Sequence, residues 1–269
     1  MSAAPTITLS EAACSVLNDP CPAGKVSKTR EYVAAWKSGK ITEIGSSCPP
    51  VHPARPPRPE LKSPRDMPRR RPTGNSGRFA FVHAIAHIEL NAINLAWDIV
   101  VRFTDKDLPR KFYDDWCDVA LDEAEHFDLL DRRLTDLGGS YGDLAAHDGL
   151  WDAAISTSDD LLVRLAVVPM VLEARGLDTT PGAIARLQQA GDQKTAEALE
   201  IIAREEIPHV RAGVHWFETL CRQRGFDPVS TFHHLIKTRF NGTLKPPFNV
   251  AARTKAGMVS EYYTCYQVK

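Results

Sequence analysis

The sequence predicts an all-α protein whose central part is a four-helix bundle with one long crossover connection. Apolar residues recur at helical spacing over several long stretches, whereas the alternation typical of strands is sparse. Two Glu-x-x-His motifs, at 123–126 and 206–209, each follow a lone glutamate by nearly the same number of residues. We expect a leader and arm over 1–73, the bundle over 74–224, and an extension over 225–269 that packs on the bundle.

Length, charge and cysteine content bound the class of protein. The 269 residues are enough for one domain with extensions or for two small domains. A net charge of −1 and a pI near 6.8 argue against a protein that coats nucleic acid, although a local basic patch stays open. The six cysteines include no Cys-x-x-Cys pair, so neither a zinc ribbon nor a thioredoxin-type motif is indicated.

The expected location follows from two features that the sequence lacks. The N-terminal region has neither the basic start nor the apolar run of a secretory signal. No stretch approaches the roughly 18 uninterrupted apolar residues of a membrane span. We therefore expect a cytoplasmic protein with reduced thiols and no membrane partner.

Residues 1–45 are expected to form a leader of two short helices. Thr8 and Glu11 have the spacing of a capping box, and a second helix is predicted from about Ser27 to Gly39. Three apolar residues of this leader are expected to dock it on the main domain: Leu17, Val33 and Trp36.

Residues 48–72 are dense in proline, which favours an extended linker or wrapping arm over a helix. The arm is also basic, with arginines at positions 55, 58, 65, 69, 70 and 71. Clustered arginine attracts phosphate, so contact with RNA or an acidic partner is one interpretation. A solvated arm over the bundle is favoured, because no aromatic residues are interleaved for base stacking and Glu60 and Asp66 interrupt the charge.

Apolar periodicity, together with bounding glycines and prolines, places the long helices. They are expected at 77–103, at 109–137, from about 158 to a break at 176, and at 192–223. A short helix is expected over 181–190. The irregular connection over 138–158 is long enough to run the length of a bundle, which gives the crossover. Beyond Gly225 we expect a short helix near His233 and His234 and an aromatic C-terminal end, Tyr262 to Tyr266, that packs on the bundle.

The four glutamates each fall in line with apolar residues at helical spacing, which predicts that all four face one core. On the second helix Asp118, Asp122 and Asp128 mark the wet face together with Glu125, so Glu123 is the better ligand candidate. Within each motif the Glu and His share a helix face and aim at one point.

Four buried carboxylates need a counter-charge, because leaving a buried charge unpaired costs several kcal/mol. Two divalent cations offset four carboxylates. The alternative is that the repeat is chance and some glutamates turn to the surface. We predict one site that holds two metal ions through Glu89, Glu123, His126, Glu173, Glu206 and His209.

Two further features near these residues have open interpretations. His83 and His87 have a spacing that suits zinc, but a polar rim around the site is favoured. Pro169 and Pro208 lie inside predicted helices beside the ligands. Each either widens the backbone at the site or bends a long helix around the core.

The chain resembles an uncharacterised ferritin-like family, a domain of unknown function. Four stretches carry the resemblance: the run from His83 to Glu89, the segment 122–127, Leu172-Glu173-Ala174-Arg175-Gly176-Leu177-Asp178, and Pro246-Pro247-Phe248-Asn249. More broadly, the six-residue pattern is similar to that of the ferritin-like di-iron superfamily. The resemblance implies a ferritin-like bundle and iron ligation by the six residues named above.

Two departures narrow what the resemblance implies. The position that holds a radical tyrosine in ribonucleotide reductase small subunits is Leu130 here, which argues against radical storage. A rubredoxin-like cysteine set is missing, which weakens a rubrerythrin interpretation.

The favoured hypothesis is an oxygen-dependent oxidoreductase that hydroxylates or oxidises a small organic substrate. Its cofactors are two Fe ions, or Mn or a mixed pair, with O2 and an unidentified electron donor as partners. Glu123 and Glu206 are the expected catalytic residues. The alternatives are ferritin-like metal handling by a homo-oligomer and a non-catalytic helical interaction protein stabilised by metal. A substrate of the transfer-RNA type is disfavoured.

Overall fold

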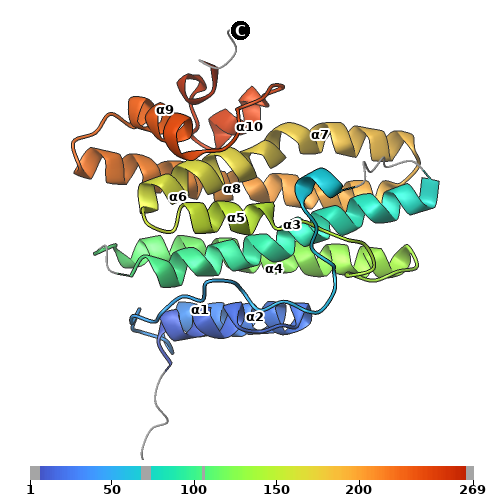
Figure 1. The fold of residues 1–269 in the computed structure, drawn as a ribbon, viewed down its shortest axis with the longest axis horizontal. Helices are drawn as coiled ribbons and strands as arrows, with labels where there is room; N and C mark the ends of the chain where they lie inside the picture. The colour runs from blue at the N-terminus through green and yellow to red at the C-terminus, as the bar shows by residue number, and fades with distance from the viewer. Residues whose placement is uncertain (1–6, 68–73, 105–106, 265–269) are drawn as a thin grey trace, which may run out of the picture. The chain divides into compact units, whose positions relative to one another are not determined.

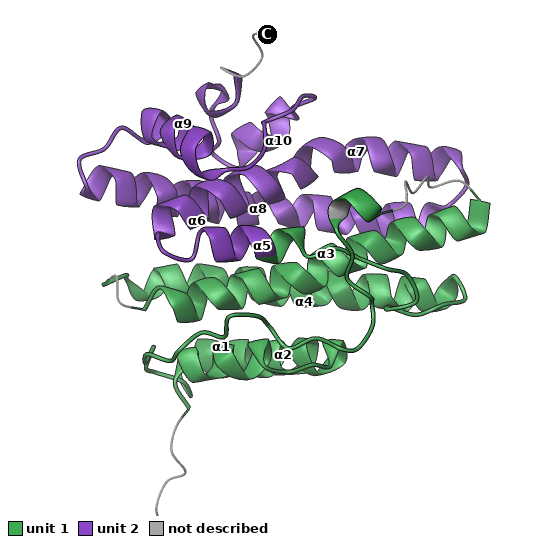
Figure 2. Ribbon diagram, viewed as in Figure 1, with its two compact units in different colours: residues 1–151 green, residues 152–269 purple. Residues whose placement is uncertain are grey.

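The protein is all-α, as predicted. A computed structural model describes residues 7–67, 74–104 and 107–264 (Figure 1). Within these ranges no strand occurs, and the β-pairing consists of an isolated bridge between Leu61 and Ala146. The chain forms two compact units, 1–151 and 152–269 (Figure 2). The predicted three-part division stays a prediction.

The first unit consists of two helix pairs that pack on each other. Its described helices are α1 (Leu9–Leu17), α2 (Pro22–Lys37), η1 (Pro64–Asp66), α3 (Gly74–Arg102) and α4 (Arg110–Asp136). Helix α3 pairs with α4, while α1 packs on α3 and α2 packs on α4 (Figure 1). The predicted bounds of α3 and α4 are confirmed to within a few residues.

The leader helices begin where local chemistry satisfies their free N–H groups. The predicted capping box of α1 is present: the Thr8 main-chain N–H donates to Glu11 Oε2 over 2.8 Å, and the Glu11 N–H donates to Thr8 Oγ1. Helix α2 starts at Pro22, earlier than the predicted Ser27, because proline is tolerated in the first turn, where its missing N–H has no helical partner.

The leader docks through the predicted apolar residues and through two indole hydrogen bonds. Leu17, Val33 and Trp36 are all buried. The Trp36 indole donates to Asp114 of α4 over 2.8 Å, and the Trp97 indole of α3 donates to Thr29 of α2 over 2.9 Å. The described cysteines, five of the six, are free thiols, as predicted.

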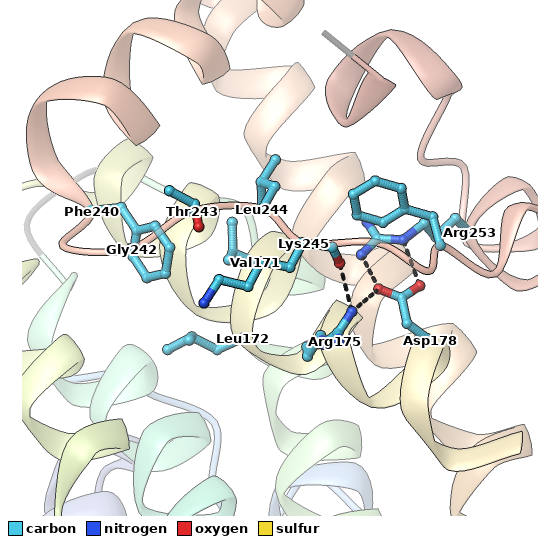
Figure 3. Close-up of a pocket in the computed structure, with 11 residues that line it drawn as sticks. Val171, Leu172, Arg175, Asp178, Phe240, Gly242, Thr243, Leu244, Lys245 and Arg253 are labelled. Carbon is cyan, nitrogen blue, oxygen red and sulfur yellow. Dashed lines mark hydrogen bonds and ion pairs between the residues drawn. The ribbon is translucent and has the colours of Figure 1, made fainter. Parts of the chain in front are cut away.

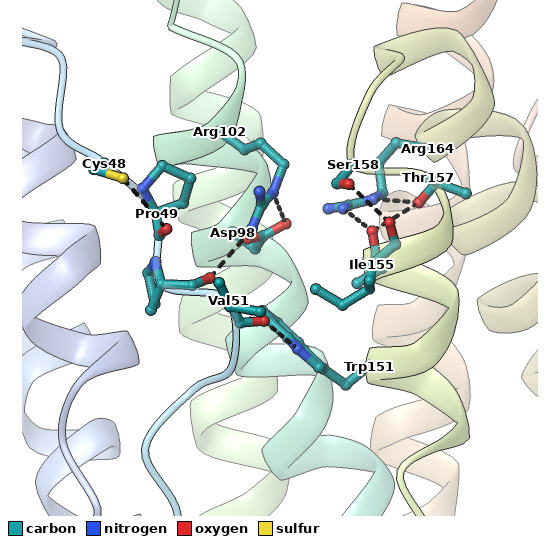
Figure 4. A network of polar contacts seen from close by, with 12 residues as sticks. Cys48, Pro49, Val51, Asp98, Arg102, Trp151, Ile155, Thr157, Ser158 and Arg164 are labelled. Carbon is teal, nitrogen blue, oxygen red and sulfur yellow. Dashed lines mark hydrogen bonds and ion pairs between the residues drawn. The ribbon is translucent and has the colours of Figure 1, made fainter.

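The proline-rich segment wraps along the first unit. Arg102 of α3 donates to Pro50 O, and the Trp151 indole donates to Val51 O over 3.0 Å (Figure 4). Arg55 turns inward, where it forms an ion pair with Asp148 and donates to Asn91 over 3.2 Å. The wrapping-arm interpretation is confirmed for the described part of the segment. The arginines at 69, 70 and 71 lie outside the described residues.

Helix α3 is long and apolar enough to cross a membrane by length and composition. However, 83% of the apolar window is buried inside the protein. The core helix of a soluble protein passes the same test, so this helix is weak evidence for a membrane span.

The second unit is organised around its longest helix, α8 (Gln193–Gln223). The other elements are α6 (Leu161–Val167), η2 (Val168–Glu173), α7 (Ala174–Gln189), α9 (Pro228–Arg239), α10 (Val250–Lys255) and η3 (Ser260–Tyr262), and the boundary between the units falls within α5 (Gly149–Ser156). Helix α8 contacts α6, η2, α7, α9 and α10. Asp160 and Asp192 cap the starts of α6 and α8, as the predicted starts near 158 and 192 require. In α6, Arg164 is buried and donates to the Thr157 hydroxyl and to Ala154 O (Figure 4).

Two predictions about the connections are wrong. The connection over 138–158 is not irregular throughout, because it contains α5. There is no break at Gly176 and no separate helix over 181–190, since α7 runs through Pro181. Proline leaves the carbonyl four residues earlier, that of Leu177, without a helical donor. The Asn249 side-chain amide donates to Leu177 O over 3.1 Å, which replaces the lost bond.

Candidate metal site

In the first unit, α3 and α4 bring together three of the predicted ligands. Glu89 comes from α3, and Glu123 and His126 come from α4. Each offers a ligand atom, and these atoms lie within 4.8 Å of one another. His126 Nδ1 is 3.4 Å from Glu89 Oε2 and 3.4 Å from Glu123 Oε2. The i,i+3 spacing places Glu123 and His126 on one face, as predicted, and pairing of the two helices adds Glu89.

The three side chains are buried, which alters their protonation. Burial, together with the neighbouring Glu123 carboxylate, raises the pKa of Glu89 well above its usual range. Burial by itself lowers the pKa of His126, but the adjacent carboxylates of Glu123 and Glu89 outweigh burial and raise it to about 11. The Glu123 carboxylate contributes to both shifts, and a bound proton or a metal cation offsets its charge.

This donor set fits a divalent first-row metal ion. Two carboxylates and an imidazole are the ligands that Fe and Mn sites use. Glu125, which also precedes His126, is exposed. Glu123 is therefore the buried glutamate of the two, and its role as a ligand stays a prediction.

In the second unit, the later motif repeats the local geometry of the earlier one. His209 Nδ1 lies 3.5 Å from Glu206 Oε2 on α8, matching the 3.4 Å between His126 and Glu123. The His209 side chain is buried, while the Glu206 side chain is 13% exposed. Glu173 is the last residue of η2 and is partly exposed. That all six residues form one site remains a prediction.

The two prolines beside the ligands behave differently. Pro169 lies in η2, a π-helical turn that ends at Glu173, so the helix is widened next to this ligand. Pro208 lies inside α8, which continues as an α-helix through it. The widened-backbone interpretation therefore holds at Pro169, and the sequence alone did not separate the two cases.

Gly213 allows α8 to approach the Pro169 ring closely. A Cβ built on Gly213 lies only 2.4 Å from Pro169 Cβ and 2.5 Å from its Cγ. Side chains larger than hydrogen are therefore excluded at this point unless η2 shifts. Gly213 follows His209 by one helical turn.

The zinc interpretation of His83 and His87 is not supported. His83 Nε2 accepts a hydrogen bond from the Gly142 N–H over 3.0 Å. His87 Nδ1 lies 2.8 Å from the Tyr141 hydroxyl, and its Nε2 lies 3.1 Å from His147 O. Burial lowers the pKa of His87 to about 4, so the ring is neutral at physiological pH. The two histidines anchor the segment around Tyr141, and the polar-rim role stays a prediction.

The second unit contains a polar cluster that the sequence alone does not reveal. Asp178 accepts from Arg253 Nε over 2.9 Å and Nη2 over 2.7 Å, and from the Asn249 N–H over 2.9 Å. Arg175 Nη1 donates to Lys245 O over 2.7 Å. These contacts join two of the stretches that carry the family resemblance, around 172–178 and 246–249. The stretches were visible as motifs, but only the fold shows that they contact each other.

The family model described as "Protein of unknown function (DUF455)" matches residues 18–264. An uncharacterized protein of Haemophilus influenzae is 42% identical over 207 residues, which cover 75% of this chain and 72% of that protein. No solved structure matches the chain. The chain therefore belongs to the DUF455 family.

Proposed function

We propose that Glu89, Glu123, His126, Glu173, Glu206 and His209 together hold two Fe or Mn ions in a ferritin-like bundle. The observation that carries the proposal is the buried cluster of Glu89, Glu123 and His126, whose surplus negative charge calls for a cation. The second motif supports it, since Glu206 and His209 repeat the local geometry of Glu123 and His126. Two divalent ions offset the charge of the four carboxylates.

The proposed activity is oxygen-dependent oxidation or hydroxylation of a small organic substrate. Bound Fe or Mn supplies the redox chemistry, with O2 as oxidant and an external electron donor. Glu123 is fully buried and suits a fixed ligand. Glu206 and Glu173 are partly exposed and have more room to change their binding mode. We place the protein in the cytoplasm, with no membrane or nucleic-acid partner.

The test is anaerobic loading with Fe(II), followed by exposure to O2 and observation by absorption and Mössbauer spectroscopy. We expect two irons per chain and a spectroscopic change on oxygen exposure. Glu123→Gln and Glu206→Gln should each lower the iron content. The matched controls are Glu125→Gln and Glu205→Gln, which alter the neighbouring glutamates and should leave it unchanged.

The alternative functions predict different results from the same experiment. Rapid oxygen uptake with growth of an iron mineral would identify metal storage. Stable metal binding without oxygen chemistry would identify a structural metal. Fewer than two irons per chain, with no effect of Glu123→Gln or Glu206→Gln, would refute the dimetal site itself.

A further inference from the structure

The second unit contains a pocket of about 280 Å³ between η2, the start of α7 and the segment that follows α9 (Figure 3). This volume lies just below the roughly 300–1,000 Å³ of drug-sized ligand sites, so it suits a small ligand. Val171 and Leu172 of η2 form one wall, and Leu244 and Phe248 contribute further apolar surface. The pocket therefore offers apolar surface to the body of a ligand.

The polar lining is dominated by positive charge. Arg175, Lys245 and Arg253 all line the pocket, against the single carboxylate of Asp178. That carboxylate is already engaged by the buried Arg253, which also lies over the Phe248 and Tyr263 rings. Arg253 and Asp178 thus form a buried ion pair that acts as structure, and Arg175 Nη1 lies 3.6 Å from the same carboxylate. The groups that remain for a ligand are Nε and Nη2 of Arg175 and the Lys245 amine.

Arg175 has hydrogen-bonding capacity to spare. Its Nη1 donates to the main-chain oxygens of Lys245 and Pro247, over 2.7 and 3.3 Å, which fixes the guanidinium in place. Within the described part of the chain, its Nε and Nη2 make no hydrogen bond, and the Lys245 amine forms no ion pair. A guanidinium with free donors in a fixed position is well suited to a carboxylate.

We propose that this pocket binds a small amphipathic carboxylic acid, with its carboxylate on Arg175 and its apolar chain against η2. Both parts of the ligand follow from the lining, which combines the cationic side chains of Arg175 and Lys245 with aliphatic and aromatic surface. A free phosphate would use the cations but leave the apolar wall unfilled. An uncharged lipid-like molecule would leave the cations unpaired.

The pocket and a proposed metal ligand share one short element. Val171 and Leu172 belong to η2, the π-helical turn that ends at Glu173. A ligand in the pocket contacts the segment that carries this glutamate. The bound acid would then belong to the class of substrate that the metal site oxidises. This second step rests on the proposed function, whereas binding of the acid does not.

The test is calorimetric titration of metal-free, full-length protein with octanoate, with octanamide as the uncharged isostere and with inorganic phosphate. We expect octanoate to bind at least about 10-fold more tightly than octanamide, because charge-assisted hydrogen bonds are roughly twice as strong as neutral ones. Phosphate should bind more weakly than octanoate. Equal binding of phosphate would reduce the site to a general anion site and overturn the proposal, as would no octanoate binding.

Two variants distinguish the loss of a positive charge from a change in the structure of the pocket. Arg175→Gln should weaken octanoate about 10-fold or more, although it also removes the bonds to the main chain. Lys245→Gln leaves those bonds intact, because Arg175 binds the main-chain oxygen, and it should weaken octanoate several-fold while leaving octanamide unchanged. Arg186→Gln on the exposed part of α7 is the matched control. Unchanged octanoate affinity in both pocket variants would refute the assignment.

A second titration separates this proposal from the dimetal function. Iron-loaded protein is mixed with O2 in the presence and absence of octanoate. Binding to metal-free protein without any effect on oxygen consumption would retain the pocket and reject its role in the proposed oxidation. Absence of binding in the metal-free protein would reject the pocket and leave the metal site untouched.

Discussion

At the scale of single residues, the buried charged groups distinguish a candidate metal site from a structural ion pair. Glu89, Glu123 and His126 are buried within reach of one another, and two of the three are carboxylic acids. Arg253 and Asp178 are also buried, but they neutralise each other through two short contacts. The first group offers a donor set for the proposed cation, whereas the second is a structural ion pair.

Lys25 provides a test of how burial of a lysine makes the free energy of unfolding depend on pH. It is 1% exposed, and its amine donates to the carbonyl oxygens of Val16 and Leu17 at the end of α1. Burial lowers its pKa from 10.5 to about 7. Between these values the unfolded chain binds a proton that the folded chain does not hold, so stability should rise with pH by up to ~1.4 kcal/mol per unit.

Urea unfolding between pH 6 and pH 9 measures this contribution. Lys25→Met should flatten the rise in unfolding free energy above pH 7. Lys40→Met, at an exposed lysine of the same unit, should retain the rise. An identical pH dependence in Lys25→Met and in the unaltered protein would show that Lys25 stays charged when buried.

At the scale of elements, a proline inside a helix is accommodated where another element supplies the missing hydrogen-bond donor or leaves room for the ring. Helix α7 passes through Pro181 because Asn249 donates to Leu177 O, and the same side chain caps α10 by accepting from the Ala252 N–H. At Pro169 the chain instead widens into η2, and Gly213 leaves room for the ring. Both solutions depend on a residue far away in the sequence.

The Pro181 arrangement predicts a measurable coupling with Asn249. Asn249→Asp keeps an oxygen to cap α10 but loses the amide that donates to Leu177 O, so it should cost about 1–3 kcal/mol. In a Pro181→Ala background the helix supplies its own donor, and the cost should shrink. A double-mutant cycle by chemical unfolding gives the coupling energy. Strictly additive effects would contradict the role assigned to Asn249.

The contact between Gly213 and Pro169 predicts an unusual response to alanine. Alanine in a helix interior ordinarily stabilises by up to ~1 kcal/mol relative to glycine. At Gly213 the added Cβ overlaps Pro169, and we expect a net loss of about 1–3 kcal/mol. Gly182→Ala in α7 is the control, since its Cβ meets Arg186 Nη1 only at 3.5 Å, and it should stabilise. Thermal unfolding of both variants checks the signs, and stabilisation by Gly213→Ala would show that η2 moves freely.

At the scale of the whole molecule, each compact unit carries one Glu-x-x-His motif. The first unit has its motif on α4 beside Glu89 of α3, and the second has its motif on α8, in contact with the η2 segment that ends at Glu173. The proposed dimetal site takes ligands from both motifs, so the proposal requires the folded form of both segments for tight metal binding.

Metal binding should therefore stabilise the entire chain. A single site at 100-fold excess over its Kd adds ~2.7 kcal/mol, which raises Tm by about 5 °C for a protein of this size. Anaerobic Fe(II) or Mn(II) should shift one cooperative thermal transition upward, and a chelator should reverse the shift. Glu123→Gln and Glu206→Gln should each reduce the shift, while Glu125→Gln should not. A shift that persists in both ligand variants would place the metal elsewhere.

The sequence by itself determined the helical class, the bounds of α3, α4 and α8 to within a few residues, and the pairing of Glu with His inside each motif. These features depend on apolar periodicity and on i,i+3 geometry, which are local to one helix. It also identified Glu123 rather than Glu125 as the buried carboxylate, since neighbouring aspartates mark the wet face.

Only the tertiary structure decided which distant groups meet. Local pattern predicted a break at Gly176, but the donor that carries α7 through Pro181 comes from Asn249, more than sixty residues later in the chain. The inward turn of Arg55 onto Asn91 and Asp148, and the pocket cations Arg175 and Lys245, depend likewise on folding. Periodicity specifies which face of an element is buried, whereas the partner that it meets is set by packing of the whole unit.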